Sequence, residues 1–138
     1  MPRSVLALER DLFFAVKIRD TLRHLALETI VVRDVVGFSQ ALAGSGSAQE
    51  SPALAIVNIA LPGVAWDEAI RLARQHGLPV LAFGPHVDLE ARTKALEAGA
   101  QRVVSNAKLS SSLIGLVQEL LASPSKDTTQ RAAEAEET

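Results

Sequence analysis

The chain has 138 residues, the length of a single domain, and carries 14 lysines and arginines against 16 aspartates and glutamates. Residues 1–122 hold twelve charged side chains of each sign, so the formal net charge of −2 comes from the acidic last 16 residues. A neutral body argues against nucleic-acid binding, because phosphates are bound by a surplus of lysine and arginine. The absence of cysteine excludes disulfides, thiol catalysis and cysteine-ligated zinc, while 48% hydrophobic residues allow a substantial core.

The N-terminal apolar run at residues 5–8 is too short for a signal-peptide core or a membrane span. It stops at the charged residues Glu9, Arg10 and Asp11. We therefore expect a protein that does not associate with a membrane and lies in the cytoplasm.

The first part of the chain alternates short apolar runs with amphipathic stretches. Residues 5–8 predict a buried strand. Asp11 is expected to cap a helix that runs to about Leu25, because apolar side chains recur there every three or four positions. A β-branched run at residues 29–32 predicts a second strand, and Asp34 then offers the cap of a shorter helix.

The remaining chain repeats this alternation three more times, after a glycine- and serine-rich stretch at residues 44–47 that we interpret as a linker. Apolar runs predict strands at residues 53–59, at residues 80–83 and around Val103 and Val104. The expected helices cover residues 66–76, residues 89–98 and a last stretch capped by Ser110 or Ser111, with Asp88 as a further cap and Gly77 and Gly99 as helix ends.

Five strand–helix units with strands that are apolar throughout predict the α/β class, with helices on both faces of a doubly wound parallel sheet. Ligands bind such sheets outside the carboxyl ends of the strands. No glycine-rich phosphate-binding motif follows any of these strands, which argues against nucleotide binding. Residues 123–138 contain no apolar side chain larger than alanine, so we expect a disordered acidic tail after a domain at residues 1–122.

Three stretches of the sequence resemble response-regulator receiver domains. They are Val-Asn-Ile-Ala-Leu-Pro-Gly at 57–63, Leu-Pro-Val-Leu-Ala-Phe at 78–83 and Lys-Ala-Leu-Glu-Ala-Gly-Ala at 94–100. The similarity extends over residues 4–122. It implies a flavodoxin-like (βα)5 fold, in which a doubly wound parallel five-stranded sheet has the strand order 2-1-3-4-5.

The resemblance also locates the phosphorylation site of the family, and the chain departs from it at each position. Glu9 and Arg10 stand where receivers have two acids that hold Mg²⁺, and Asn58 stands where they have the phosphoacceptor aspartate. Gly84 replaces the switch serine or threonine, and Asn106 replaces a lysine. Because the amide of Asn58 is neutral and a poor nucleophile, we expect neither an aspartyl phosphate nor an enzymatic activity.

These positions also predict weak metal binding. Arg10 brings a cation where an acid would stand, and we expect it to pair with Glu9 or Asp11. Glu9 and Asp11 remain as weak candidates for metal ligands, so no cofactor is expected, Mg²⁺ included. Lys108 could supply the missing cation, although an exposed loop lysine is the simpler interpretation. His86 could accept a proton or phosphate near the pocket mouth, but no acid partner is identifiable beside it.

Two functions fit these observations. The first is a phosphorylation-independent receiver-like signalling module, a pseudo-response regulator that acts through protein–protein interaction. The alternative is a small-ligand or metal-binding domain that uses the repurposed pocket around Glu9, Asp11 and Asn58. The absence of a recognisable nucleophile–base pair or phosphate cradle favours the interaction module.

In receivers, the fourth helix, the fifth strand and the fifth helix form an output and dimer face. The matching candidates in this chain are four charged residues that we expect to be exposed, namely Arg92, Glu97, Arg102 and Glu119. A mixed-charge set suits reciprocal pairs across a two-fold axis, although an ordinary solvated surface would have the same composition. The resemblance thus predicts a protein partner from a signalling pathway, or a homodimer through this face.

Overall fold

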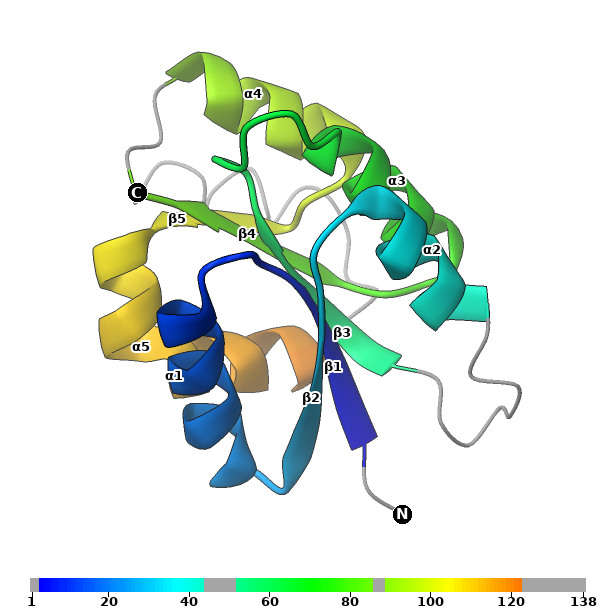
Figure 1. Cartoon of the computed structure of the whole chain (residues 1–138). Coiled ribbons are helices and arrows are strands. Elements are labelled where there is room, and N and C mark those ends of the chain that lie inside the picture. The colour runs from blue at the N-terminus through cyan, green and yellow to red at the C-terminus, as the bar shows by residue number, and fades with distance from the viewer. Residues whose placement is uncertain (1–2, 44–51, 86–88, 123–138) are drawn as a thin grey trace.

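The computed structural model describes residues 3–43, 52–85 and 89–122. Within these ranges, five parallel strands form one sheet in the order β2-β1-β3-β4-β5, which confirms the expected topology (Figure 1). The strands are β1 (Arg3–Leu8), β2 (Leu27–Val32), β3 (Pro52–Asn58), β4 (Val80–Gly84) and β5 (Arg102–Ser105).

Helices cover both faces of this sheet, so the described part of the chain has three layers (Figure 1). α1 and α5 lie on one face, and α2, α3 and α4 lie on the other. The helices are α1 (Leu12–Arg23), α2 (Val35–Ala43), α3 (Trp66–Gln75), α4 (Leu89–Ala98) and α5 (Asn106–Ala122).

The core is divided by the sheet into two apolar clusters, and β1 contributes to both. Leu6 and Leu8 pack in the cluster under α2, α3 and α4, whereas Val5 and Ala7 pack in the cluster under α1 and α5. All four side chains are buried. Burial on both faces explains why this strand is apolar throughout and shows no polar alternation.

Three of the predicted helix-end residues, Asp11, Asp34 and Gly77, act as expected. Asp11 Oδ1 accepts hydrogen bonds from the backbone N–H groups of Phe13 (3.0 Å) and Phe14 (3.4 Å), and Asp34 Oδ1 accepts one from Gly37 (2.8 Å). These carboxylates satisfy donors that have no partner inside the first helical turn. After α3, Gly77 has a φ of 79°, the left-handed conformation expected of a residue just past a helix.

The connection between α1 and β2 differs from the prediction. The helix ends at Arg23 and not near Leu25, and β2 begins at Leu27, two residues before the predicted strand. The cause is Ala26, whose φ of 61° turns the chain out of the helix and directly into the sheet. Alanine carries no sequence signal for this conformation, which usually selects glycine or asparagine.

The start of α5 was also mispredicted. The helix begins at Asn106 and not after Ser110 or Ser111, because Ser105 Oγ accepts a hydrogen bond from the backbone N–H of Lys108 (3.1 Å) and acts as the cap. Ser112 has non-helical dihedral angles (φ −132°, ψ 20°), so a kink divides α5 into two helical segments. The second segment begins directly after the serine-rich stretch, where the sequence predicted the start of the helix.

Several predictions fall on residues that the structure does not describe. They concern the linker at residues 44–47, His86, the cap at Asp88 and the acidic tail at residues 123–138. Among the described helices, none is long and apolar enough to cross a membrane.

Candidate functional site

The carboxyl ends of β1 and β3 bring two polar side chains together in the interior. Glu9 directly follows β1, and its backbone N–H donates to the carbonyl oxygen of Val32 (3.0 Å), which holds it against the end of β2. Asn58 is the last residue of β3. Both side chains are buried, with Glu9 2% and Asn58 8% exposed, although 49 residues separate them in the sequence.

The two side chains bind each other directly. Asn58 Nδ2 donates hydrogen bonds to both carboxylate oxygens of Glu9, at 2.9 Å to Oε1 and 3.0 Å to Oε2. These distances are typical of well-formed N–H···O bonds to an ionised acceptor. We refer to this arrangement as the Glu9–Asn58 pair.

Backbone donors complete the pair. Glu9 Oε1 also accepts hydrogen bonds from the N–H groups of Arg10 (2.8 Å) and Asp11 (3.2 Å), and Asn58 Oδ1 accepts one from Ala60 (2.8 Å). A buried carboxylate is tolerated when such donors replace the lost water. The hydrogen-bonding groups of the pair are therefore satisfied within the protein, and the pair connects β1, β3 and the start of α1.

The side chain of Arg10 does not behave as predicted. Its Nε donates to the carbonyl oxygen of Arg33 (3.0 Å), and the residue is exposed. The ion pairs of the described residues do not include Arg10 with either Glu9 or Asp11. The expected pairing is wrong because the hydrogen-bonding capacity of Glu9 Oε1 is used by Asn58 and by two backbone amides, while Asp11 caps α1.

Asp11 follows Glu9 by two positions in the sequence, but its carboxylate caps a helix. Its Oδ1 accepts from Phe13 and Phe14 at the start of α1, as described above. Within the part of the chain that the structure describes, no group of three or more histidine, aspartate or glutamate side chains is placed to hold a metal ion.

Gly84 and Asn106 complete the set of predicted site positions at the same sheet edge. Gly84 is the buried last residue of β4 and pairs in register with Ser105 of β5. Asn106 opens α5, and its Oδ1 is buried without a hydrogen-bond partner among the described residues. Lys108 is exposed, as the simpler interpretation predicted, but it lies in the first turn of α5 and not in a loop.

Sequence reasoning missed one contact near this edge. The rings of Phe14 on α1 and Phe83 on β4 lie with their centroids 5.3 Å apart and tilted by 54°, a favourable aromatic geometry. The periodic apolar pattern of α1 placed Phe14 on the buried face of the helix, but no sequence signal named its partner. The contact fixes the first turn of α1 to the strand next to β3.

On the predicted interaction face of α4, β5 and α5, two of the four charged residues bind each other within the chain. The side chain of Arg102 is only 9% exposed, and its Nη1 donates to Glu119 Oε1 (3.0 Å) and Oε2 (3.1 Å) in the same chain. The expected exposure of Arg102 is therefore wrong, because packing of α5 against β5 covers its side chain. Glu97 is exposed, and Arg92 is partly buried with its Nη1 3.5 Å from the carbonyl oxygen of Val103.

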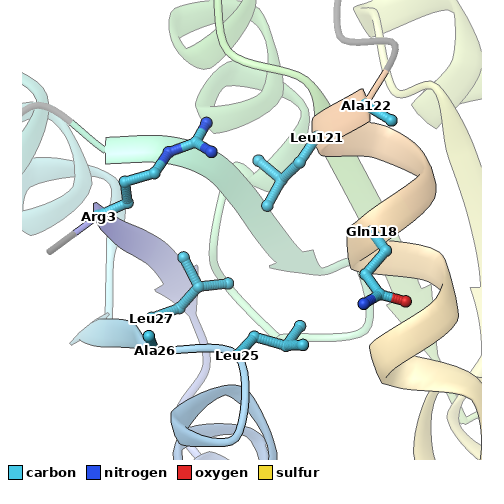
Figure 2. A pocket seen from close by; sticks show the side chains of 7 residues that line it. All are labelled: Arg3, Leu25, Ala26, Leu27, Gln118, Leu121 and Ala122. Carbon is cyan, nitrogen blue, oxygen red and sulfur yellow. The ribbon is translucent and has the colours of Figure 1, made fainter.

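A hollow of about 490 Å³ lies at the opposite edge of the sheet (Figure 2). It is formed by the turn before β2, the first residue of β1 and the end of α5, and its lining includes Leu25, Leu27, Leu121, Arg3 and Gln118. These are the amino ends of the strands, whereas ligands of doubly wound sheets bind at the carboxyl ends. The hollow is thus separate from the Glu9–Asn58 pair.

Comparison with solved structures identifies the fold. A CheY-like response regulator receiver domain protein from Methanospirillum hungatei JF-1 matches with a TM-score of 0.73 and 17% identity, over 98% of this chain and 100% of that one. The phosphorylated cyanobacterial phytochrome response regulator RcpA matches with a TM-score of 0.72 and 14% identity, over 91% and 98% of the two chains. The chain therefore has the fold of response-regulator receiver domains.

At the level of sequence, the chain is 30% identical over 121 residues to an uncharacterized 76.5 kDa protein in the phbC 3′ region of Thiocystis violacea. The match covers 83% of this chain and 16% of that protein, so the chain spans about a sixth of the length of this relative. No family model matches the chain.

Proposed function

We propose that the chain is a phosphorylation-independent, receiver-like signalling module that acts in the cytoplasm through protein–protein contacts and not as an enzyme. The observation that carries this proposal is the Glu9–Asn58 pair. In it, the amide of Asn58, which stands where the resemblance to receivers puts the phosphoacceptor, is bound to the buried carboxylate of Glu9. The receiver fold supplies the signalling context.

The chemistry of Asn58 supports this proposal. An amide is uncharged and a poor nucleophile, so it cannot take over a phosphoryl group as an aspartate carboxylate does. Both polar atoms of the amide are also hydrogen-bonded, since its Nδ2 donates to Glu9 and its Oδ1 accepts from the backbone N–H of Ala60. A reacting phosphoryl group would have to break these bonds without gaining a nucleophile.

The Mg²⁺ ion that the resemblance implies does not fit these residues. Such a site needs six oxygen ligands in near-ideal octahedral geometry, of which one or two are carboxylates with oxygens free to bind the ion and several are waters. Among the described residues at this edge, the buried carboxylate is that of Glu9, and one of its oxygens already accepts three hydrogen bonds. Asp11 is engaged in capping α1, so the proposed function involves no metal ion.

The alternative function as a ligand-binding or metal-binding domain has less support. It requires the side chains of Glu9, Asp11 and Asn58 to bind one ligand or metal ion together. Instead, Glu9 and Asn58 bind each other, and the carboxylate of Asp11 is directed at the backbone of α1.

A titration followed by amide NMR tests the proposal. Mg²⁺ is added first and beryllofluoride, a mimic of the bound phosphoryl group, is added second, with a receiver domain that has an intact acid pocket as the control. We expect the control to shift and the amides of Glu9, Asn58 and Gly84 to stay in place. Saturable shifts of these three amides would overturn the proposal, because they would show that the pocket still binds the ligands of a phosphorylated receiver.

A further inference from the structure

The hollow at the amino edge of the sheet has the size and the lining of a small-molecule site. Its volume of about 490 Å³ falls within the roughly 300–1,000 Å³ of most ligand pockets. Three leucines form its apolar part: Leu25 precedes β2, Leu27 opens β2, and Leu121 lies in the last turn of α5 (Figure 2). Leu27 is buried, whereas the other two are only partly covered. These half-covered side chains are available to an apolar ligand.

Among the described residues that line the hollow, Arg3 is the one that carries a charge. It is the exposed first residue of β1, and the ion pairs of the described residues do not include it. Gln118 adds an uncharged amide from α5. In Figure 2, Arg3 and Gln118 approach the hollow from opposite sides, with the leucines between them. The lining therefore combines one cation with an aliphatic surface.

The position of the hollow explains why its charge comes from a side chain. Helices of a parallel α/β sheet begin at the carboxyl edge, where their backbone N–H groups attract anions, and they end at the amino edge. At the end of α1, the carbonyl oxygen of Leu22 accepts from the N–H of Leu25 (2.9 Å). The next carbonyl, that of Arg23, accepts from the N–H of Ala26 (3.0 Å). The backbone of this turn bonds to itself, so Arg3 is the group that is placed to bind an anion.

The hollow is also bordered by strained backbone. Ala26 has a φ of 61°, in the left-handed region, and it lies between Leu25 and Leu27. Residues in such conformations persist only where the surrounding structure holds them, and they cluster at sites that bind ligands. Here the strained turn leads from α1 into β2 and places a leucine of the hollow on each side of Ala26.

We propose that the hollow binds an aliphatic monocarboxylate, with the carboxylate on Arg3 and the hydrocarbon chain against the three leucines. A guanidinium and a carboxylate form strong, charge-assisted hydrogen bonds. One cation matches one carboxylate, so a dicarboxylate would place its second charge against apolar side chains without a partner. The inference goes beyond the proposed function, because it assigns a ligand to the edge of the sheet opposite the Glu9–Asn58 pair.

Two other occupants fit less well. Residues 123–138 follow Ala122 of the hollow directly and carry carboxylates, but they contain no apolar side chain larger than alanine. They therefore cannot cover the leucines. A second copy of the chain would bring its own Arg3 toward the first one, because a two-fold interface pairs a surface with itself. A free aliphatic acid matches both the charge and the apolar lining.

The test uses octanoate as the probe and follows its binding by amide NMR of the full chain. We expect saturable shifts at residues 25–27 and 118–122. Two further probes have chains of the same length and different end groups, namely suberate, a dicarboxylate, and octanol, a neutral alcohol. Both should bind at least about tenfold more weakly than octanoate, because neither combines one carboxylate with an apolar end.

Substitutions of Arg3 test its part in binding. Arg3→Gln removes the charge and should weaken octanoate binding at least about tenfold. Arg19→Gln is the matched control, the same change at an exposed arginine of α1 outside the hollow, and it should bind as the natural chain does. Arg3→Glu reverses the charge, so it should lose octanoate and bind octylammonium instead.

Four results would overturn the inference. Octanoate could give no saturable shifts, its shifts could map away from the hollow, or suberate and octanol could bind as well as octanoate. The fourth is a shift of residues 123–138 in Arg3→Gln without any probe, which would identify the acidic segment as the occupant. None of these results bears on whether Mg²⁺ and beryllofluoride bind at Asn58, so the failure of this inference and the failure of the proposed function are distinguishable.

Discussion

At the scale of single residues, the amide of Asn58 is what makes the buried Glu9 carboxylate acceptable. The amide donates to both carboxylate oxygens, and two backbone N–H groups add further donors, so one negative charge is buried with its hydrogen bonds made. A second carboxylate at position 58 would remove the donor and add a like charge at about 3 Å.

We therefore predict that Asn58→Asp destabilises the chain by about 2–4 kcal/mol at pH 7, because the buried Glu9 carboxylate loses its hydrogen-bond donor and gains a like charge beside it. Repulsion between the two carboxylates would raise the pKa of one of them above that of a free carboxyl. The variant is therefore least destabilised at low pH, where that group is protonated, and its loss of stability grows as the pH rises above about 4. Denaturant unfolding at pH 5 and pH 7 measures this, and Asn58→Ala, which removes the donor without adding charge, is the control. A loss that is the same at both pH values would contradict the explanation.

At the scale of elements, the passage from α1 to β2 depends on one alanine in a left-handed conformation. Ala26 has a φ of 61°, where the Cβ atom is too close to the following carbonyl oxygen. The turn is nevertheless regular, because the N–H of Leu25 bonds to the carbonyl oxygen of Leu22 (2.9 Å) and that of Ala26 to Arg23 (3.0 Å). The short connection sets where β2 begins beside β1.

Ala26→Gly should stabilise the chain by about 0.5–1 kcal/mol, since the relief of left-handed strain exceeds the extra entropy of glycine in the unfolded state. Gly77→Ala is the matched control. Gly77 has a φ of 79° and no atom within 4 Å of an added Cβ, so the reverse substitution should cost about 1 kcal/mol through the backbone alone. Urea unfolding of both variants measures the two values, and a loss of stability in Ala26→Gly would contradict the strain argument.

At the scale of the whole molecule, the face formed by α4, β5 and α5 is the candidate surface for self-association. The Arg102–Glu119 ion pair is made within one chain, so this face has fewer charges available for a partner than the sequence predicted. Glu97 remains as an exposed acid on α4. A two-fold contact at this face would therefore depend more on Glu97 than on the Arg102–Glu119 pair.

If the chain dimerises through this face, light scattering at high concentration should give the mass of two chains. Glu97→Lys should shift the mass toward one chain, and Glu28→Lys, the same charge change on an exposed residue of β2, should leave it unchanged. A monomer at every concentration would exclude this homodimer.

The order of the strands and helices was predictable from the sequence because it depends on local pattern. Apolar runs such as residues 53–59 identify buried strands, and Asp11 and Asp34 mark helix starts through hydrogen bonds to nearby backbone groups. The resemblance to receivers then predicted the strand order and placed Glu9 and Asn58 at one edge of the sheet. Ala26 breaks the local rules, and α5 is capped by Ser105 and not by the later serines that offered the same capping chemistry, so the element boundaries beside Ala26 and Ser105 were mispredicted.

Only the tertiary structure decided which side chains bind each other. Glu9 is bonded to Asn58 and not to Arg10, Arg102 is buried against Glu119, and Phe14 meets Phe83. These contacts join elements far apart in the chain. Each depends on how the helices pack on the sheet and on which donors lie within hydrogen-bond distance of a buried acceptor. Sequence spacing fixes the face on which a residue lies, whereas its partner is selected by the packing of the whole domain.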